Sequence, residues 1–449
     1  MSLQESSVGD HIGMPKHKTY TRRHAWLITA ALVVLMMINW ADKAVLGLAA
    51  KPLMTELGIS SSQYGLISSC FFLVFCVSSA LIGFVANRVQ TTSLLLVMAL
   101  LWSVTQIPIV LSATVGVLFA SRILLGAAEG PAYPVMVHAV HKWFPDSDRN
   151  LPTSLITFGA PIGVVIAAPV LTWLIIDHGW RTAFVSLGIV GFVWALVWIR
   201  IGREGPSVSP SIEQREHIGS NPDAPTRNEL QDERVPYLKI FLSGTWLASI
   251  LAGFAIYWAL TLLTTWVPLY LQDGLGYSAS ASGTLITLPW LVYAIALVAQ
   301  GYITGRMMRR GVSSRTARGV LGGCCITLAG IAMLALLITP PGILQIVLLA
   351  LAFGIGSPIV PISQTVTAEL TPARQRAGVL GTAAAVFSLA GIIAPYFVGR
   401  IIDASNTPLD GYKTAFAMTA VVLIVAGIAA TTLIRPQRDA QRIRACRDT

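Results

Sequence analysis

The chain has 449 residues, of which 54% are hydrophobic and only 12% charged, and its formal net charge is +10. A soluble domain carries about 25% charged residues, so this composition excludes an ordinary water-soluble protein and favours one whose solvent is lipid. The basic residues lie in short runs between long apolar stretches, and this excludes an extended nucleic-acid-binding surface.

The N-terminal segment 1–23 is polar and basic and has no apolar core or small-residue cleavage site, so we expect a cytoplasmic tail and not a signal peptide. Twelve apolar stretches follow, each of about the 20 residues that a helix needs to cross a bilayer. We predict them at 24–50, 62–86, 92–111, 114–140, 151–176, 180–200, 240–270, 280–305, 318–339, 342–368, 376–402 and 412–434.

The longest polar interruption, 201–239, divides the twelve stretches into six and six. We therefore predict an N-terminal six-helix bundle at 24–201, a cytoplasmic central loop at 202–239, a C-terminal six-helix bundle at 240–434 and a cytoplasmic tail at 435–449. With the N-terminus inside, 25 of the 31 lysines and arginines lie on the inner side. Basic residues concentrate in cytoplasmic loops, so we expect a multi-pass plasma membrane protein, in a bacterium an inner-membrane one, with both termini cytoplasmic.

The two predicted bundles repeat each other. The interval from Pro169 to Asp177 equals that from Pro395 to Asp403, and Gly-Pro at 130–131 has a counterpart in Gly-Ser-Pro at 356–358. Parallel repeats of this kind are typical of transporters that bind substrate between two bundles near the membrane midplane. The predicted fold is an all-α membrane protein with twelve transmembrane helices in two parallel six-helix bundles.

Four ionisable residues interrupt the apolar stretches: Asp42, Lys43, Arg122 and Glu129. Each such group costs about 2.5–3.5 kcal/mol at the bilayer centre, so these groups should face a cavity or each other. The alternative is a structural ion pair or side chains that reach the membrane surface. Lys43 and Arg122 are predicted at a similar depth, ~10–12 Å from the outer ends of their helices. Glu129 follows Arg122 by seven residues, on the same face and two turns deeper.

These residue types suit proton-coupled anion transport. A guanidinium such as that of Arg122 binds both oxygens of a carboxylate. An acid whose neighbouring cation is either free or occupied by substrate changes its proton affinity, and this couples the two ligands. Tyr257, on the seventh helix, is a further candidate for contact with substrate. The sequence has no Walker lysine motif, zinc motif or nucleophile elbow, and its five cysteines lack paired metal-ligand spacing, so we expect no enzymatic activity, metal or cofactor.

Motifs along nearly the whole chain resemble those of the major facilitator superfamily, and within it the anion:cation symporter family. They are NWADK at 39–43, ELGIS at 56–60, RILLGAAE at 122–129, GPAYP at 130–134, WFP at 143–145 and GWR at 179–181. The resemblance implies uptake of sugar acids, or of aromatic and other carboxylates, together with protons. It also implies that Asp42 and Glu129 carry protons, and that Lys43 and Arg122 hold the substrate anion.

The chain departs from this family at positions that would line the pocket. Lys43 stands where the family usually has Arg. Sugar-acid members have Tyr at the position of Phe75, Gln at those of Ser79 and Ala160, and Asn at that of Ser388. These substitutions remove hydroxyl-binding groups, so an aromatic or aliphatic acid is favoured over a sugar acid.

Two alternatives remain open from the sequence. An exporter or uniporter of a neutral or cationic compound would not need Arg122. A non-transporting membrane receptor is disfavoured by paired acids and bases at midplane depth. The expected partners are a small organic anion, protons and the lipid bilayer, with no nucleic acid.

Overall fold

The computed structural model describes residues 22–85, 89–112, 114–145, 148–205, 235–372 and 375–445. Most of the predicted N-terminal tail and central loop, residues 1–21 and 206–234, lies outside the described residues, as does the end of the predicted C-terminal tail at 446–449. The twelve predicted spans are confirmed, because the described residues contain 12 helices long and apolar enough to cross a membrane.

The first half contributes six spans, and a short helix follows the first of them. In chain order its helices are α1 (Arg22–Leu48), α2 (Ala50–Leu57), α3 (Ser61–Val85), α4 (Thr91–Leu111), α5 (Val115–Glu129), α6 (Ala132–His141), α7 (Asn150–His178) and α8 (Trp180–Ile201). The fourth span comprises both α5 and α6. Apolar helices of this length satisfy their own backbone hydrogen bonds, as a spanning segment must in lipid.

The second half has the same number of spans. Its main helices are α12 (Gly244–Thr265), α14 (Ala279–Leu285), α15 (Thr287–Arg309), α16 (Leu321–Ile338), α17 (Ile343–Gly354), α18 (Ile359–Leu370), α19 (Arg376–Asp403) and α20 (Pro408–Leu433). The short elements are α11 (Tyr237–Phe241), α13 (Val267–Leu269), η2 (Tyr270–Gly274), η3 (Arg315–Val320) and α21 (Pro436–Ala445).

The fourth and tenth spans are interrupted at the positions that the sequence repeat aligns. α5 ends at Glu129 and α6 begins at Ala132, while α17 ends at Gly354 and α18 begins at Ile359. Pro131 and Pro358 stand in these breaks. A proline has no N–H for the helical ladder and its ring clashes with the preceding turn, so each span is divided into two helices near its middle.

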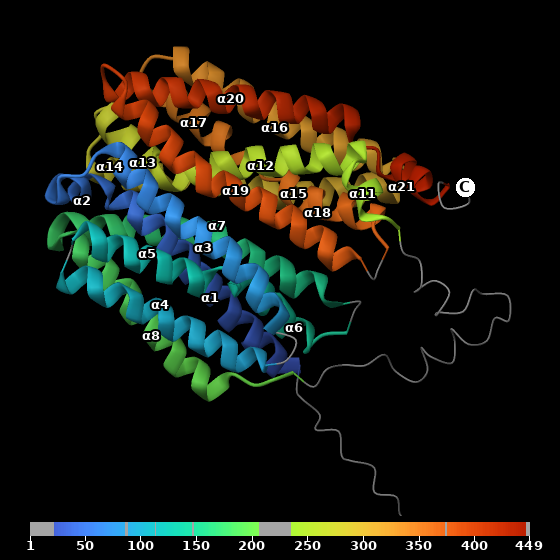
Figure 1. Cartoon of the computed structure of the whole chain (residues 1–449), viewed down its shortest axis with the longest axis horizontal. Helices are drawn as coiled ribbons and strands as arrows, with labels where there is room; N and C mark the ends of the chain where they lie inside the picture. The colour runs from blue at the N-terminus through green and yellow to red at the C-terminus, as the bar shows by residue number, and fades with distance from the viewer. Residues whose placement is uncertain are drawn as a thin grey trace, which may run out of the picture.

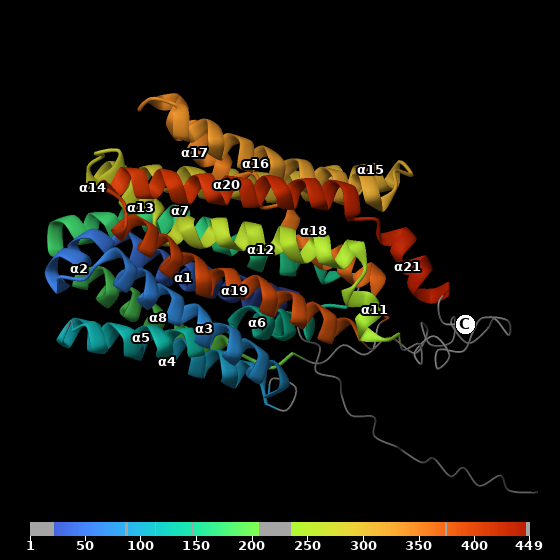
Figure 2. The same ribbon diagram turned by 45° about the horizontal axis from the view of Figure 1, so that its top comes forward.

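The helices run roughly parallel to the long axis of the molecule, with the first half on one side and the second half on the other (Figure 1). Both views place α6, α11 and α21 at one end and α2, α13 and α14 at the opposite end (Figure 2). We call these the terminal end and the distal end. The halves meet mainly where α3 packs along α19 and where α7 packs on α14 and α15.

Polar contacts join the two halves at the distal end. The Asp403 carboxylate accepts hydrogen bonds from the backbone N–H of Ser61 at 3.0 Å and of Ser62 at 2.8 Å, so that it caps α3. Lys51, on α2, forms an ion pair with Asp273 of η2 at 2.6 Å. A buried apolar cluster that draws on both halves lies beneath these contacts. The distal end is therefore closed in this structure.

Candidate functional site

A buried ion pair joins α1 to α5. The Lys43 ammonium donates to Glu129 Oε2, and the two side chains are 8% and 0% exposed. The same ammonium donates to Asn39 Oδ1 at 2.7 Å, one turn earlier on α1. Side chains on a helix point back toward its N-terminus, and this carries the Lys43 ammonium away from the distal end. Its charge thus lies deeper than its backbone.

Two glycines of α5 allow Glu129 to approach. A Cβ added at Gly126 would lie 2.3 Å from the carbonyl oxygen of Phe71, and one at Gly130 would lie 2.2 Å from that of Phe75. Real Cβ atoms do not approach a backbone oxygen so closely, so these positions require glycine if α5 is to pack this tightly on α3. The tight packing sets Glu129 against the part of α3 that carries the two phenylalanines.

Three aromatic rings surround the Lys43 ammonium. Its Nζ lies 5.4 Å from the ring centroid of Trp40, 5.6 Å from that of Phe71 and 5.5 Å from that of Phe75. These distances are within the ~6 Å over which a cation is attracted to an aromatic face. We call Lys43, Glu129 and these three rings the lysine cage. The cage compensates part of the hydration that the ammonium loses.

The neighbouring residue, Asp42, faces a different part of the first half. Successive residues of a helix differ by about 100° in direction, so Asp42 points toward α4 while Lys43 points toward α3 and α5. Asp42 is 2% exposed and accepts a hydrogen bond from Gln106 Nε2 at 3.1 Å. Two adjacent residues of α1 therefore place a carboxylate against α4 and an ammonium against α3 and α5.

Arg122 is the second buried cation, and it is only 2% exposed. Its guanidinium carbon lies 5.3 Å from the ring centroid of Phe184 on α8. It interacts electrostatically with Asp42 and Glu129, but no described residue forms an ion pair with it within 4.0 Å, and its Nε and Nη2 have no hydrogen-bond partner among the described residues. Unmade hydrogen bonds of a buried cation are costly, so these donors are available to a ligand or to a rearranged carboxylate.

The other predicted site residues are distributed differently. Phe75 belongs to the lysine cage. Ser388 donates its hydroxyl at 2.9 Å to the carbonyl of Ala384 in its own helix, and Ala160 is buried in the core of the first half. Tyr257 of the second half lies near Cys76 of the first half. Among the described residues, no hydrogen bond joins Ser388, Tyr257 or the half-buried Ser79 to the charged cluster.

Sequence reasoning put Lys43 and Arg122 at a similar depth and left open whether the charged groups face a cavity or each other. In the structure the ammonium pairs with Glu129, since the lysine stem reaches one turn along the helix. Sequence reasoning also missed Gln106, whose side-chain amide donates a hydrogen bond to Asp42. Gln106 is the one amide side chain within the stretch 92–111, and this was the signal available. No group of three or more His, Cys, Asp or Glu residues that could hold a metal occurs in the part of the chain that the structure describes.

Two of the sequence motifs meet at the distal end. Glu56, in the ELGIS motif, accepts a hydrogen bond from Trp180 Nε1 at 2.8 Å and two from Arg181 at 3.0 and 2.5 Å. These bonds, those of Arg181 first and that of Trp180 second, lower the pKa of Glu56 from 4.5 to about 2. The cluster fastens α2 to the start of α8. The residues of these motifs therefore hold the distal end together and lie outside the charged cluster.

The sequence family described as Major Facilitator Superfamily matches residues 32–340 and 312–445. A hexuronate transporter of Bacillus subtilis (strain 168) is 27% identical over 409 residues, covering 89% of this chain and 92% of that protein. A probable sulfoacetate transporter, SauU, of Cupriavidus necator is 24% identical and covers 91% of this chain and 94% of its own length.

Among solved structures, a bacterial homologue of the human lysosomal transporter Spinster, in an inward-facing and unoccupied conformation, superposes with a TM-score of 0.74. It is 18% identical, and the match covers 94% of this chain and 99% of that one. At this identity the likeness concerns the fold, and it confirms the expected arrangement of twelve helices in two six-helix bundles.

Proposed function

Because the chain belongs to the Major Facilitator Superfamily and its relatives are transporters, we propose that it is a secondary active transporter that takes up an organic carboxylate together with protons. The observation that carries the proposal is the buried ion pair between Lys43 and Glu129. An ammonium paired with an acid can exchange that acid for a substrate carboxylate when the acid becomes protonated.

Charge balance supports the coupling. Asp42 and Glu129 offset Lys43 and Arg122, so the ionised cluster is neutral, and all four side chains are buried or nearly so. A substrate carboxylate would add one uncompensated negative charge, which is costly away from water. Protonation of Glu129 removes one negative charge from the cluster. Substrate and proton therefore bind favourably together and unfavourably apart.

Each charged residue has a role in the proposed cycle. Protonated Glu129 releases Lys43, which then contacts the substrate carboxylate. Arg122, whose Nε and Nη2 have no partner among the described residues, is the second cation of the anion site. Asp42, held by Gln106, is the second proton carrier. The two halves then alternate between closure at one end and at the other, as parallel-repeat transporters do.

We propose that the substrate has fewer hydroxyls than a hexonate. A hydroxyl buried without a hydrogen-bond partner costs about 1–3 kcal/mol, so two unmatched hydroxyls would lower affinity by about 30-fold or more. Phe75, Ala160 and Ser388 offer few such partners, since Ser388 donates its hydroxyl to its own helix. The rings of the lysine cage favour an aromatic or aliphatic body. The named relatives include transporters of both kinds of acid, a hexuronate and the short acid sulfoacetate.

Competition for uptake tests the substrate class. Cells that express the chain take up a labelled benzoate-like acid while an excess of benzoate, succinate or gluconate is present. We expect benzoate or succinate to compete more strongly than gluconate. Competition by gluconate alone would reject this substrate class and leave the coupling proposal intact.

Glu129→Gln tests the coupling. The amide cannot carry a proton, so proteoliposomes with this variant should lose accumulation of substrate driven by a pH gradient. Exchange of internal for external substrate should remain, because exchange needs no net proton movement. A variant that still accumulates substrate against its gradient would exclude Glu129 as the proton carrier.

We also propose that the distal end faces the outside, with both termini in the cytoplasm. The distribution of basic residues supports this orientation, since α6, α11 and α21 gather at the end where lysines and arginines concentrate. In a bacterium this places the protein in the inner membrane, where an inward proton gradient would drive uptake.

A further inference from the structure

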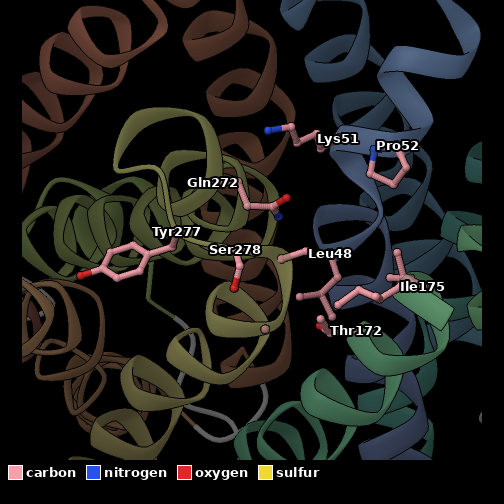
Figure 3. A pocket seen from close by; sticks show the side chains of 11 residues that line it. Leu48, Lys51, Pro52, Thr172, Ile175, Gln272, Tyr277 and Ser278 are labelled. Atoms are coloured by element: carbon pink, nitrogen blue, oxygen red, sulfur yellow. The ribbon is translucent and has the colours of Figure 1, made fainter.

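A pocket lies at the distal end between the two halves, apart from the charged cluster. Its volume is about 440 Å³, within the ~300–1,000 Å³ of small-molecule sites. Leu48, Thr172 and Ile175 of the first half line one side, and Gln272 and Ser278 of the second half face them (Figure 3). A molecule bound here would contact both halves at once.

The pocket lining carries one positive charge, that of Lys51. Among its lining residues only Lys51 is charged, and the rest are apolar or uncharged polar side chains. The Lys51 ammonium pairs with Asp273 at 2.6 Å, and the side chains of the two residues are 50% and 31% exposed. Exposed pairs of this kind contribute little free energy. An incoming anion can therefore replace Asp273 at small cost.

A buried hydroxyl lies in the wall of the pocket, where α7 meets α14. Thr172 lines the pocket, is 6% exposed, and its Oγ1 has no hydrogen-bond partner among the described residues. Threonines inside helices usually bond to their own backbone or to a neighbour, and a buried unpaired hydroxyl is unfavourable. Gly283 of α14 faces this hydroxyl, since a Cβ there would lie 2.1 Å from Thr172 Oγ1, so the group marks a tight contact between the two halves beside the pocket.

The sequence repeat explains why the pocket is present. Asp403 at the end of α19 caps the start of α3, and the repeat assigns the same task to Asp177 at the end of α7, toward the start of α14. Asp177 has no hydrogen bond with a described residue. The pocket lies beside the contact of α7 with α14, and at this place Asp177 does not make the hydrogen bonds that Asp403 makes at the equivalent one.

From this geometry we propose that the pocket is a second binding site, for a small organic anion with an apolar body such as benzoate. Leu48, Pro52 and Ile175 would contact the body, and Lys51 the carboxylate. Because the occupant touches both halves, it stabilises the arrangement in which the distal end is closed. This site uses none of the residues of the charged cluster, and it can exist even if the proposed coupling is wrong.

Protection of a cysteine from labelling tests the site. The full chain is purified without its five native cysteines and with Ala279→Cys, a small change in the pocket lining, and a maleimide reacts with it in the presence of benzoate. At about ten times its dissociation constant, benzoate should slow labelling about ten-fold, since protection follows occupancy. Asn406→Cys, exposed between α19 and α20, should react at an unchanged rate.

The two members of the ion pair make the test specific. Lys51→Gln should raise the benzoate concentration that gives half-protection by about two- to five-fold, and Asp273→Asn should lower it by a similar factor, as expected for exposed charges. If the ion pair only stabilised the fold, both variants would shift the half-protection concentration in the same direction. Lys413→Gln is the matched control, an exposed lysine at the same end and outside the pocket.

Arg122→Ala separates this site from the proposed transport site. Protection that persists in Arg122→Ala supports a separate pocket. Protection that disappears with Arg122→Ala and survives Lys51→Gln would show that labelling reports the charged cluster, and the proposal would then be rejected. Absence of protection by benzoate in the Ala279→Cys protein without any further substitution in the pocket would also reject it.

Discussion

Lys43 gives the first half a buried cation that can change its partner. It is bound to Glu129 and Asn39 and surrounded by three rings. Truncating one member of a buried charge pair costs about 2–5 kcal/mol, so Lys43→Ala should weaken substrate binding by about 30-fold or more. Titration calorimetry with the acid that competes best in uptake measures the effect.

Lys43→Arg is the informative companion of this variant. A guanidinium keeps the charge and adds a second parallel hydrogen bond to a carboxylate, so binding should be retained. Lys413→Ala, an exposed lysine on α20, should leave the dissociation constant unchanged. Equal loss of binding in Lys43→Ala and Lys413→Ala would mean that Lys43 does not contact substrate.

At the residue scale, the sequence could identify the charged groups and not their pairing. The apolar neighbours of Asp42 and Glu129 make each carboxylate conspicuous in the sequence. Pairing depends on side-chain direction, and a lysine stem spans more than one helical turn, so backbone depth alone could not decide which of the two carboxylates the Lys43 ammonium contacts. Of the three rings around the Lys43 ammonium, only that of Phe75 belongs to a residue that the sequence suggested for the site, and it was suggested as a substrate contact.

The close approach of α3 to α19 provides a prediction about whole elements. A Cβ at Gly65 would lie 2.3 Å from the carbonyl oxygen of Pro395, so Gly65→Ala must push the two helices apart at the distal end. Overpacking costs about 1–3 kcal/mol, enough to shift the open–closed equilibrium about 5- to 150-fold. The reaction rate of a cysteine at Ser69, buried in this contact, should rise accordingly.

Gly116→Ala is the matched control, because a Cβ there meets nothing within 4 Å. Its labelling rate and its apparent unfolding temperature should match those of the parent. If Gly65→Ala labels no faster than Gly116→Ala, the closed distal end does not depend on this contact. A lower unfolding temperature without faster labelling would indicate local strain in place of opening.

The cluster that fastens α2 to α8 predicts a pH effect on stability. The pKa of Glu56 is lowered from 4.5 to about 2 by Arg181 and Trp180, so its stabilising contribution is complete above about pH 4.5 and is lost as the pH falls toward 2. Glu56→Gln should lower the free energy of unfolding at pH 7 by up to about 1 kcal/mol, because the pair is exposed.

Unfolding curves of the parent and Glu56→Gln, measured between pH 7 and pH 3, should therefore converge as the pH falls. Asp177→Asn serves as control, since the exposed Asp177 has no hydrogen bond with a described residue, and its difference from the parent should stay constant. A gap for Glu56→Gln that widens at low pH would contradict the assigned role of the carboxylate.

The boundaries of the spans could be predicted from the lengths of the apolar stretches, and the breaks within the fourth and tenth spans could be predicted from their prolines. The span predicted at 114–140 is found at Val115–His141, yet it comprises α5 and α6 because Pro131 interrupts the ladder. The tight contact of α5 with α3 could not be predicted, since it depends on which face Gly126 and Gly130 present. A glycine pattern indicates close packing without identifying the partner helix.

At the scale of the whole molecule, the sequence repeat predicted two equivalent bundles and did not predict their unequal closure. Asp403 caps α3, whereas Asp177 leaves a pocket at the matching place. The shared motif, a proline followed eight residues later by an aspartate, is compatible with either arrangement, because closure depends on how the two halves rotate against each other. Such bistability is what alternating access requires.

Membrane orientation is the last prediction, and it concerns the molecule as a unit. Because 25 of 31 lysines and arginines lie in segments on the side of the termini, the distal end should face outward. In a cysteine-free background, Asn406→Cys should react with an impermeant maleimide in intact cells. Asp223→Cys, in the central segment outside the described residues, should react only after permeabilisation. Reaction of Asp223→Cys in intact cells would reverse the orientation, and with it the direction of the proposed proton-driven transport.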